Sequence, residues 1–261
     1  MARSLWRGSL SFGLVNVPVA LYSAVRDLDV HFHQLHADSH ERVEVKRVCK
    51  KGDEVPYEEI GFGYDLDSGK EVVLTQDELD AAAPEKTRTI DIDEFVDVAD
   101  IDPVFYDHAY YLVPQGEGEG PARAYALLVE VMAKQELAAL GRLVLRTKEH
   151  LVAIRVRDGL LQAMTMIFAD EVRPAGDLDL PAKKDAPSNK ELDNAVALVD
   201  ELSRDFNPDR YKDCHRERVL AMIRRKRSGK KIEAPKEPET PKAVDELLAA
   251  LERSLEEVRS R

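Results

Sequence analysis

The chain has little cysteine: only Cys49 and Cys214 occur in its 261 residues. Two thiols cannot build a disulfide framework, so reduced thiols in a cytosolic compartment are the simpler interpretation. No uninterrupted apolar segment is long enough to span a bilayer, and the N-terminus lacks the long apolar stretch of a signal peptide. We therefore expect a cytoplasmic protein without a membrane anchor.

The usual motifs of catalysis are also missing. There is no G-x-S-x-G nucleophile elbow and no P-loop. The glycines of QGEGEG (115–120) alternate with acids, which disfavours binding of phosphate. In CKKG (49–52) the position of a second zinc-knuckle cysteine is taken by Gly52. We expect a protein that is not an enzyme and has no cofactor and no metal.

Histidines leave one enzymatic alternative open. His31 and His33 would share one face of a strand predicted over 30–36, as metal ligands do in some β-barrels. Such a site needs further ligands, and His108 and His150, the candidates in the core, lie in no recognisable ligand motif. Strand and turn histidines without a metal are the interpretation that we favour.

Basic residues are outnumbered by acidic ones, but they occur in clusters. The chain holds 38 Lys and Arg against 50 Asp and Glu, a formal net charge of −12, which argues against indiscriminate binding to nucleic acid. Binding follows local potential rather than net charge, so each cluster is either a solvated surface or a set of phosphate contacts. The candidate DNA-binding residues are Lys46, Arg47, Arg142, Arg146, Lys148, Arg155, Arg157, Arg224, Arg225, Lys226, Arg227, Lys230 and Lys231.

Strand patterns dominate the chain up to residue 187, where the apolar period becomes helical. Asp158-Gly159 between two apolar runs predicts a hairpin across 151–168. Capping-box pairs at Thr75/Glu78 and Ser188/Glu191 mark the starts of two helices. The predicted strands are 5–24, 30–36, 42–49, 87–98 and 109–114, and the predicted helices are 74–84, 121–140, 188–206, 208–227 and 243–261.

The last predicted helix is amphipathic and follows EAPKEPETPK, an extended linker at 233–242. A narrow apolar stripe on a linker needs a surface to cover it. That surface is either the rest of this chain or a groove in another protein. A scaffold whose main function is this helix is therefore a further alternative. The stripe consists of Val244, Leu247, Leu248, Leu251, Leu255 and Val258.

Several long segments are similar to motifs of one family. They include LWRGSLSFGLVNVPVALYSA (5–24), VVLTQDELDAAAPEKTRTIDIDEFVD (72–97) and GRLVLRTKEHLVAIRVRDGLL (141–161). Together with shorter segments they cover most of residues 3–173, in the family's order. Through them the chain resembles the bacterial Ku proteins. Relatives often carry CxxCG where this chain has CKKG, so a metal role is not carried over.

The resemblance implies a non-enzymatic homodimeric ring that binds double-stranded DNA ends without sequence specificity in non-homologous end joining, at breaks in the nucleoid. It implies a mixed β/α fold: a β-barrel core with an inserted helix and an extended bridge, then a helical C-terminal arm. The apolar stripe would recruit and stimulate the ATP-dependent DNA ligase D. The expected divisions are core and bridge 1–187, arm 188–232, Pro-rich linker 233–242 and ligase-recruiting helix 243–261.

Overall fold

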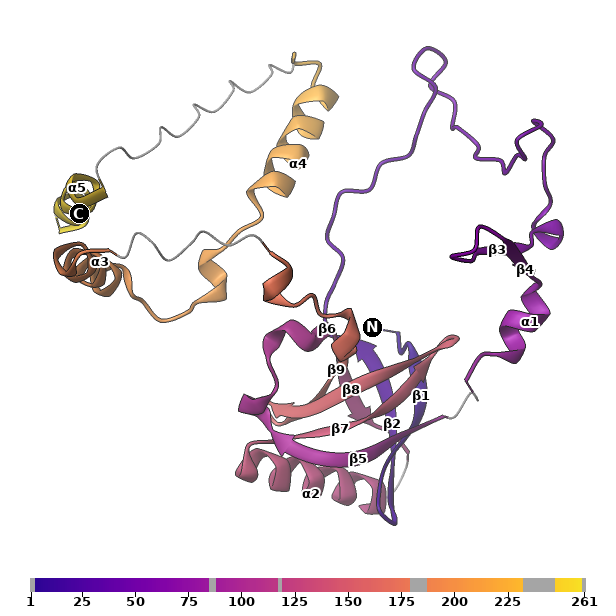
Figure 1. Cartoon of the computed structure of the whole chain (residues 1–261), viewed down its shortest axis with the longest axis horizontal. Helices are drawn as coiled ribbons and strands as arrows, with labels where there is room; N and C mark the ends of the chain where they lie inside the picture. Colours follow the sequence, from indigo (N-terminus) through magenta and orange to yellow (C-terminus); the bar gives the residue numbers. More distant parts are fainter. Residues whose placement is uncertain (1–2, 85–87, 117–118, 179–186, 232–246, 260–261) are drawn as a thin grey trace. The chain divides into compact units, whose positions relative to one another are not determined.

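Seven strands close into a β-barrel (Figure 1). A computed structural model describes residues 3–84, 88–116, 119–178, 187–231 and 247–259. All neighbouring strands are antiparallel except β1 and β5, whose parallel pairing closes the barrel. In barrel order the strands are β1 (Trp6–Phe12), β2 (Val15–Ser23), β6 (Tyr106–Pro114), β9 (Leu160–Met166), β8 (Lys148–Arg157), β7 (Leu137–Leu145) and β5 (Thr89–Asp97).

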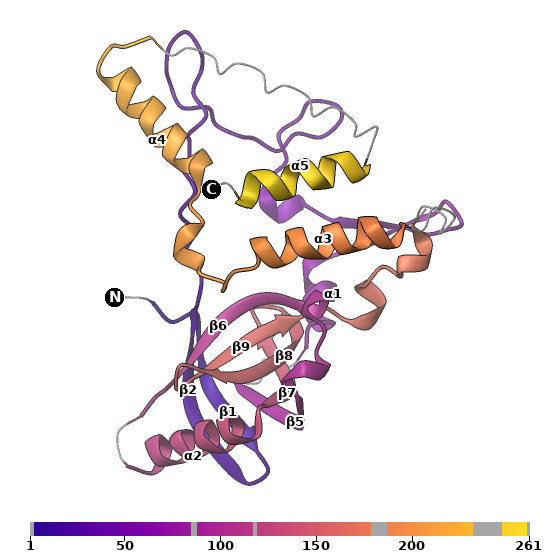
Figure 2. The ribbon, with the colours of Figure 1, turned by 90° about the vertical axis from the view of Figure 1, so that its left-hand side faces the viewer.

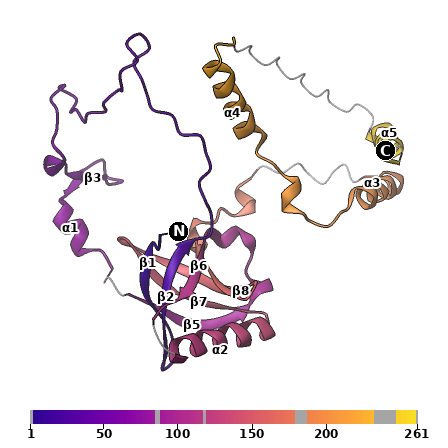
Figure 3. The ribbon, with the colours of Figure 1, turned by 180° about the vertical axis from the view of Figure 1, so that it is seen from behind.

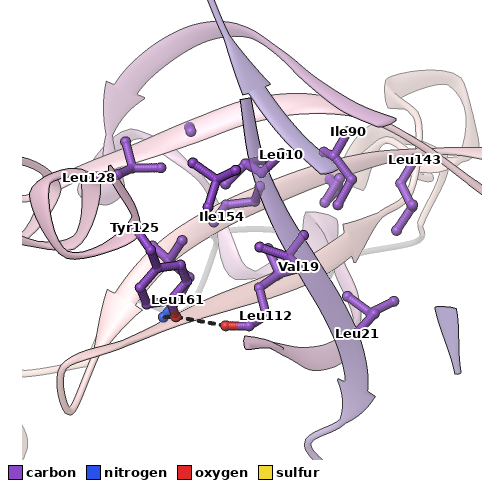
Figure 4. Close-up of a cluster of buried hydrophobic side chains, with 14 of the residues drawn as sticks. Leu10, Val19, Leu21, Ile90, Leu112, Tyr125, Leu128, Leu143, Ile154 and Leu161 are labelled. Carbon is purple, nitrogen blue, oxygen red and sulfur yellow. Dashed lines mark hydrogen bonds between the residues drawn. The ribbon is translucent and has the colours of Figure 1, made fainter. Parts of the chain in front are cut away.

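The barrel is filled by its own side chains. Alternate residues of each strand point inward, and the side chains of Leu10, Leu21, Leu112 and Ile154 are fully buried (Figure 4). The hairpin predicted at Asp158-Gly159 is confirmed: Arg157 pairs with Leu160, and both turn residues have positive φ, as a two-residue type I′ turn requires.

Helix α2 (Glu119–Gln135) is inserted between β6 and β7 and packs against the barrel. Its Tyr125 hydroxyl donates to the carbonyl of Leu112 at 2.7 Å and accepts from the amide of Leu161 at 2.9 Å (Figure 4). Leu112 and Leu161 are register partners on β6 and β9, so the hydroxyl bridges two backbone groups that face each other across this strand pair. Burial raises the pKa of Tyr125, which keeps the hydroxyl protonated.

Replacing Tyr125 by Phe is expected to lower the free energy of unfolding by about 1–3 kcal/mol, because a buried donor and a buried acceptor lose their partner. Thermal denaturation should show a melting temperature lower by several degrees. Tyr111→Phe is the matched control, because Tyr111 directly precedes Leu112 on β6 and is 38% exposed. An equal shift in both variants would contradict the bridging role.

Residues 28–84, here called the bridge, contain few regular elements (Figures 1 and 3). The strands predicted over 30–36 and 42–49 are wrong: only the isolated bridges Leu35–Arg42 and Val48–Glu54 form there. Val45 is 87% exposed, so this alternating segment has no core face to bury and no continuous neighbour to pair with. The bridge contains η1 (Tyr57–Glu59), β3 (Phe62–Asp65), β4 (Glu71–Leu74) and α1 (Gln76–Ala81).

Both capping boxes are confirmed, at Thr75/Glu78 and at Ser188/Glu191. In each, the serine or threonine hydroxyl accepts from the backbone amide three residues on, and the glutamate accepts in return. These backbone and hydroxyl bonds stabilise the glutamate anions, so the pKa values of Glu78 and Glu191 are lowered.

Other predicted helix ends need correction. Residues 137–140, predicted as helix, belong to β7, because Glu136 takes a positive φ and Ala138 and Ala139 are buried in the sheet. The helix from 188 stops at Leu202, where Ser203 is extended, rather than at Asn207. The next helix starts at Cys214, capped by Asp213, rather than at 208.

The chain divides into two compact units, Met1–Asp27 with His33–Asp177 and Leu28–Phe32 with Leu178–Arg261. The second unit contains the predicted arm and the amphipathic helix. Its helices are α3 (Asn189–Leu202), α4 (Cys214–Arg227) and α5 (Leu247–Arg259). The remaining short helices are η2 (Val98–Asp100), η3 (Pro103–Phe105), η4 (Ala169–Glu171), η5 (Ala175–Asp177) and η6 (Pro208–Arg210).

Candidate nucleic-acid interface

The predicted cations of the barrel separate into groups at the two ends of β8. Lys148 begins this strand and Arg157 ends it, which places them about 30 Å apart at 3.3 Å per residue. Arg155 and Arg157 lie on the outer face of β8, because Ile154 is buried and Val156 packs on the core. The five barrel cations therefore do not form one strip along the strands.

Arg142, on β7, is surrounded by acids. Its guanidinium lies 3.1 Å from the Glu149 carboxylate on β8 and 3.8 Å from Asp93 on β5. All three side chains are substantially exposed, so each ion pair stabilises the barrel little. The pairs do reduce the local positive potential, which makes Arg142 the least suited of the five barrel cations to bind a phosphate.

Arg146 lies in the tight turn between β7 and β8, and Lys148 begins β8 directly after this turn. Arg146 has a positive φ in this turn, and both side chains are exposed. Within the described part of the chain neither forms an ion pair at 4.0 Å or less. Arg146 opposes the rise in the pKa of Tyr110 that burial and Asp107 cause. These two residues are the barrel cations that are most available to a phosphate.

Near the β8–β9 turn, Arg155 and Arg157 each contact a polar side chain of the same chain. The Nε of Arg155 donates to the Gln162 side chain at 3.2 Å across the β8–β9 pair. Arg157 lies 3.9 Å from the carboxylate of Asp158 in the turn. Arg157 is exposed and Arg155 is half-buried, so Arg157 is the more accessible of the two to a phosphate, although the Asp158 carboxylate reduces the positive potential beside it.

On the bridge, the predicted pair Lys46 and Arg47 also has local partners. The Nζ of Lys46 lies 2.9 Å from the Glu54 carboxylate, and the Arg47 guanidinium lies over the Tyr57 ring, 5.5 Å from its centroid. Between them, the amide of Cys49 donates to the carbonyl of Asp53, which closes a turn at CKKG. Hydrogen bonds and side-chain packing stabilise this turn.

The structure removes the geometric basis of the metal-enzyme alternative. His31 and His33 are exposed and lie outside any strand, so no strand face aligns them. Among the described residues, no group of three or more His, Cys, Asp or Glu side chains could hold a metal ion. Within the same residues, no helix is both long and apolar enough to cross a bilayer.

Helix α4 holds the densest positive charge. It carries six Arg or Lys residues and a single acid, Glu217. The four cations of its last turn are all exposed and complement the negative end of the helix dipole. The prediction missed Arg216 and Arg218, which belong to the same helix; their signal was their position in a segment already predicted as helical.

The helix ends in a Schellman motif that explains the sequence RSGKK. Gly229 adopts a positive φ, its amide donates to the carbonyl of Lys226, and the amide of Lys230 donates to that of Arg225. The motif turns the chain so that Lys230 and Lys231 follow directly on the cationic last turn, and both are exposed. Six predicted cations thus lie within eight consecutive residues.

The apolar stripe of α5 is partly covered. Leu248, Leu251, Leu255 and Val258 are half-buried, whereas Leu247 is 52% exposed. Val244 lies outside the described residues. The covering surface is α3, which contacts α5 in the second unit (Figure 2).

Comparison with known proteins identifies the fold. The family model described as the Ku70/Ku80 beta-barrel domain matches residues 11–194. This chain belongs to the Ku family. The mixed β/α fold that the sequence predicted is therefore confirmed, since the seven-stranded barrel and the inserted α2 fall inside the matched range.

Ku relatives from bacteria extend the similarity over the whole chain. A protein of Anaeromyxobacter sp. (strain K) is 44% identical over 100% of this chain and 88% of its own length. Proteins of Heliobacterium modesticaldum and Mycobacterium tuberculosis are 40% and 36% identical, over 100% and 97% of this chain and 94% of each relative. All three are named non-homologous end joining protein Ku. The two alignments over 100% of this chain thus include α4 and α5, beyond the range of the family model.

Proposed function

We propose that this protein binds double-stranded DNA ends, without sequence specificity and without catalysis, in non-homologous end joining. The observation that carries the proposal is the full-length similarity to bacterial Ku proteins named for that process. Local electrostatics support it, because exposed cations lie at the β7–β8 turn and along α4 in a chain of net charge −12. Contacts to phosphate carry affinity but no sequence information.

We propose that the core and bridge (1–187) surround the duplex and that the arm (188–232) adds positive charge through α4. On this division, Arg146 and Lys148 supply contacts from the barrel, and Lys46, Arg47, Arg155 and Arg157 add weaker ones because of their local partners. The linker 233–242 separates these surfaces from the ligase-recruiting helix 243–261. The protein would act at DNA breaks in the nucleoid.

We propose further that two copies form the ring. The free chain leaves large apolar side chains uncovered on the bridge, among them Tyr64 and Val73, at 65% and 64% exposure. A face of α3 is also uncovered, with Val196 at 53% and Val199 at 61%. Large apolar side chains that are exposed close together mark interaction surfaces, and a second copy is the occupant that the proposed ring requires.

Val196→Asp with Val199→Asp is expected to shift the protein from two chains to one in sedimentation equilibrium, because both charges would be buried in the dimer interface. The exposed positions of these side chains leave the fold of the single chain intact. Asp193→Asn, on an exposed position of the same helix, is the matched control. A double variant that retains the mass of two chains would show that this face of α3 lies outside the interface.

The amphipathic helix is proposed to recruit and stimulate the ATP-dependent DNA ligase D through its apolar stripe. Removing 243–261 is expected to abolish stimulation of end joining by ligase D, while binding to DNA ends stays within about twofold, because the cationic surfaces are untouched. Gel-shift and ligation assays on the same preparation measure both. Loss of DNA binding together with stimulation would favour the alternative in which the tethered helix is the main functional part.

A further inference from the structure

Helix α3 has two apolar faces, and only one of them is open. The open face contains Leu192, Val196, Val199 and Leu202, each about half exposed. The second face includes Ala195 and Leu198, which are half-buried, and α5 lies along α3 in the same unit (Figures 1 and 2). The helix that sequence patterns place on a linker therefore packs on a helix of its own chain.

The two helices pair in parallel. The Nζ of Lys190, near the start of α3, lies 3.0 Å from the Glu252 carboxylate, and the Nε of Arg259 lies 3.3 Å from the Glu201 carboxylate near the end of α3. Both ion pairs link residues in the same N-to-C order, which shows that the two helices run in the same direction.

The half-buried positions have matching spacing on the two helices. On α5 the half-buried residues of the apolar stripe fall at intervals of three and four residues, which is the spacing of a coiled-coil seam, and Ala249 and Ala250 beside them are half-buried too. On α3, Glu191, Asn194, Leu198 and Glu201 have the same spacing, and the half-buried Ala195 and Ala197 are small enough to let the helices approach. The seam consists of Glu191, Asn194, Ala195, Leu198 and Glu201 of α3 and Leu248, Leu251, Leu255 and Val258 of α5.

We infer that α3 binds α5 in the free protein and occludes the apolar stripe used to recruit ligase D, so that recruitment requires α5 to leave α3. The inference rests on the proposed function for its partner and adds the regulation of that surface. The four half-buried residues of the stripe cannot contact α3 and a ligase groove at once. The apparent affinity for the ligase is then the intrinsic affinity multiplied by the fraction of molecules in which α5 is released.

The pairing is built to be reversible. The Nδ2 atom of Asn194 is buried and has no hydrogen-bond partner within the described residues, which weakens the seam. Both ion pairs are exposed, at 49–68% for Lys190–Glu252 and 43–59% for Glu201–Arg259, so solvent and salt screen them. A seam that contains an unpaired amide and screened charges favours release over permanent closure.

Two substitutions on α3 move the equilibrium in opposite directions and leave α5 unchanged. Leu198→Asp places a charge in the seam and should release α5. Asn194→Leu removes the unpaired amide and should hold α5 more tightly. Asp200→Asn, at an exposed position of the same helix, is the matched control. The full-length protein is used throughout.

Hydrogen exchange of the amides of residues 247–259 reports the pairing directly, because a 13-residue helix without a partner is marginally stable. We expect protection in the unaltered protein, loss of it in Leu198→Asp, and an increase in Asn194→Leu. In parallel, we expect ligase D to bind Leu198→Asp about tenfold more tightly and Asn194→Leu several-fold more weakly than the unaltered protein.

The outcomes separate the inference from the proposed function. Unprotected α5 amides in the unaltered protein would overturn the pairing. Ligase D binding with equal affinity to all three forms would keep recruitment but overturn occlusion. Absence of ligase binding to the unaltered protein and to Leu198→Asp alike would overturn both, since release is expected to reveal the site. If Leu198→Asp fails to fold, the opposite shifts expected for Asn194→Leu still decide the question.

Discussion

Linear duplex DNA is expected to bind this protein at least roughly a hundredfold more tightly than a closed circle of the same sequence. The proposed ring of two chains would admit a duplex only through an end. A closed circle is left with non-specific electrostatic contact, with dissociation constants on the order of 10⁻⁴–10⁻⁶ M at physiological salt. Fluorescence anisotropy with a relaxed minicircle, before and after a single double-strand cut, measures the difference.

A nicked minicircle is the control for this comparison, because it has a strand break but no duplex end, and it should bind like the closed circle. The logarithm of the affinity for the linear form should fall with the logarithm of the salt concentration, by about 0.9 for each phosphate neutralised. Equal affinity for closed and linear DNA would exclude threading while leaving the fold and the family unaffected.

Local sequence signals predicted the parts of the fold that depend on local interactions. The Asp158-Gly159 turn and the boxes at Thr75/Glu78 and Ser188/Glu191 each involve residues within four positions of one another, and all three are present. The closure of the barrel could not be predicted from such local signals. It depends on the parallel pairing of β1 with β5, about eighty residues apart in the sequence.

The bridge shows why an alternating apolar pattern is insufficient on its own to predict a strand. Residues 30–36 and 42–49 alternate like strands, but a strand forms only where a neighbouring strand supplies hydrogen bonds and a core receives one face. Residues 137–140 show the converse, since their alanine-rich helical composition yields to the sheet in which Ala138 and Ala139 are buried. In both places the deciding contacts are distant in sequence.

The candidate interface shows the same difference between features that are local in sequence and contacts that are not. The sequence shows which cations are close together along the chain, because that spacing is local, although the prediction missed Arg216 and Arg218 of α4. It could not say which cations have acidic partners: Arg142 lies between Asp93 and Glu149 on two neighbouring strands, and Lys46 pairs with Glu54 across a turn. These partners rank Arg146, Lys148 and α4 above the other candidates for contact with phosphate.

The cations of α4 therefore provide the strongest single test of the interface. Replacing Arg224, Arg225, Lys226 and Arg227 together by Gln should weaken binding to DNA ends by up to about 10³-fold at 0.1 M salt and make the salt slope shallower by up to about 3.6. Gln retains helix propensity, so α4 should persist in circular dichroism. The loss should be the same for duplexes of different sequence, because phosphate contacts carry no base information.

The control for this variant is a matched removal of charge elsewhere. Arg225→Gln with Lys226→Gln is compared with Arg123→Gln with Lys134→Gln, two exposed cations of α2 that belong to none of the candidate clusters. If DNA neutralises the end of α4, only the first pair changes the salt slope, by about 1.8. Equal small effects of both pairs would mean that the sequence RRKR serves to cap the helix dipole and to solvate the arm, and that the barrel and bridge bind the DNA end without it.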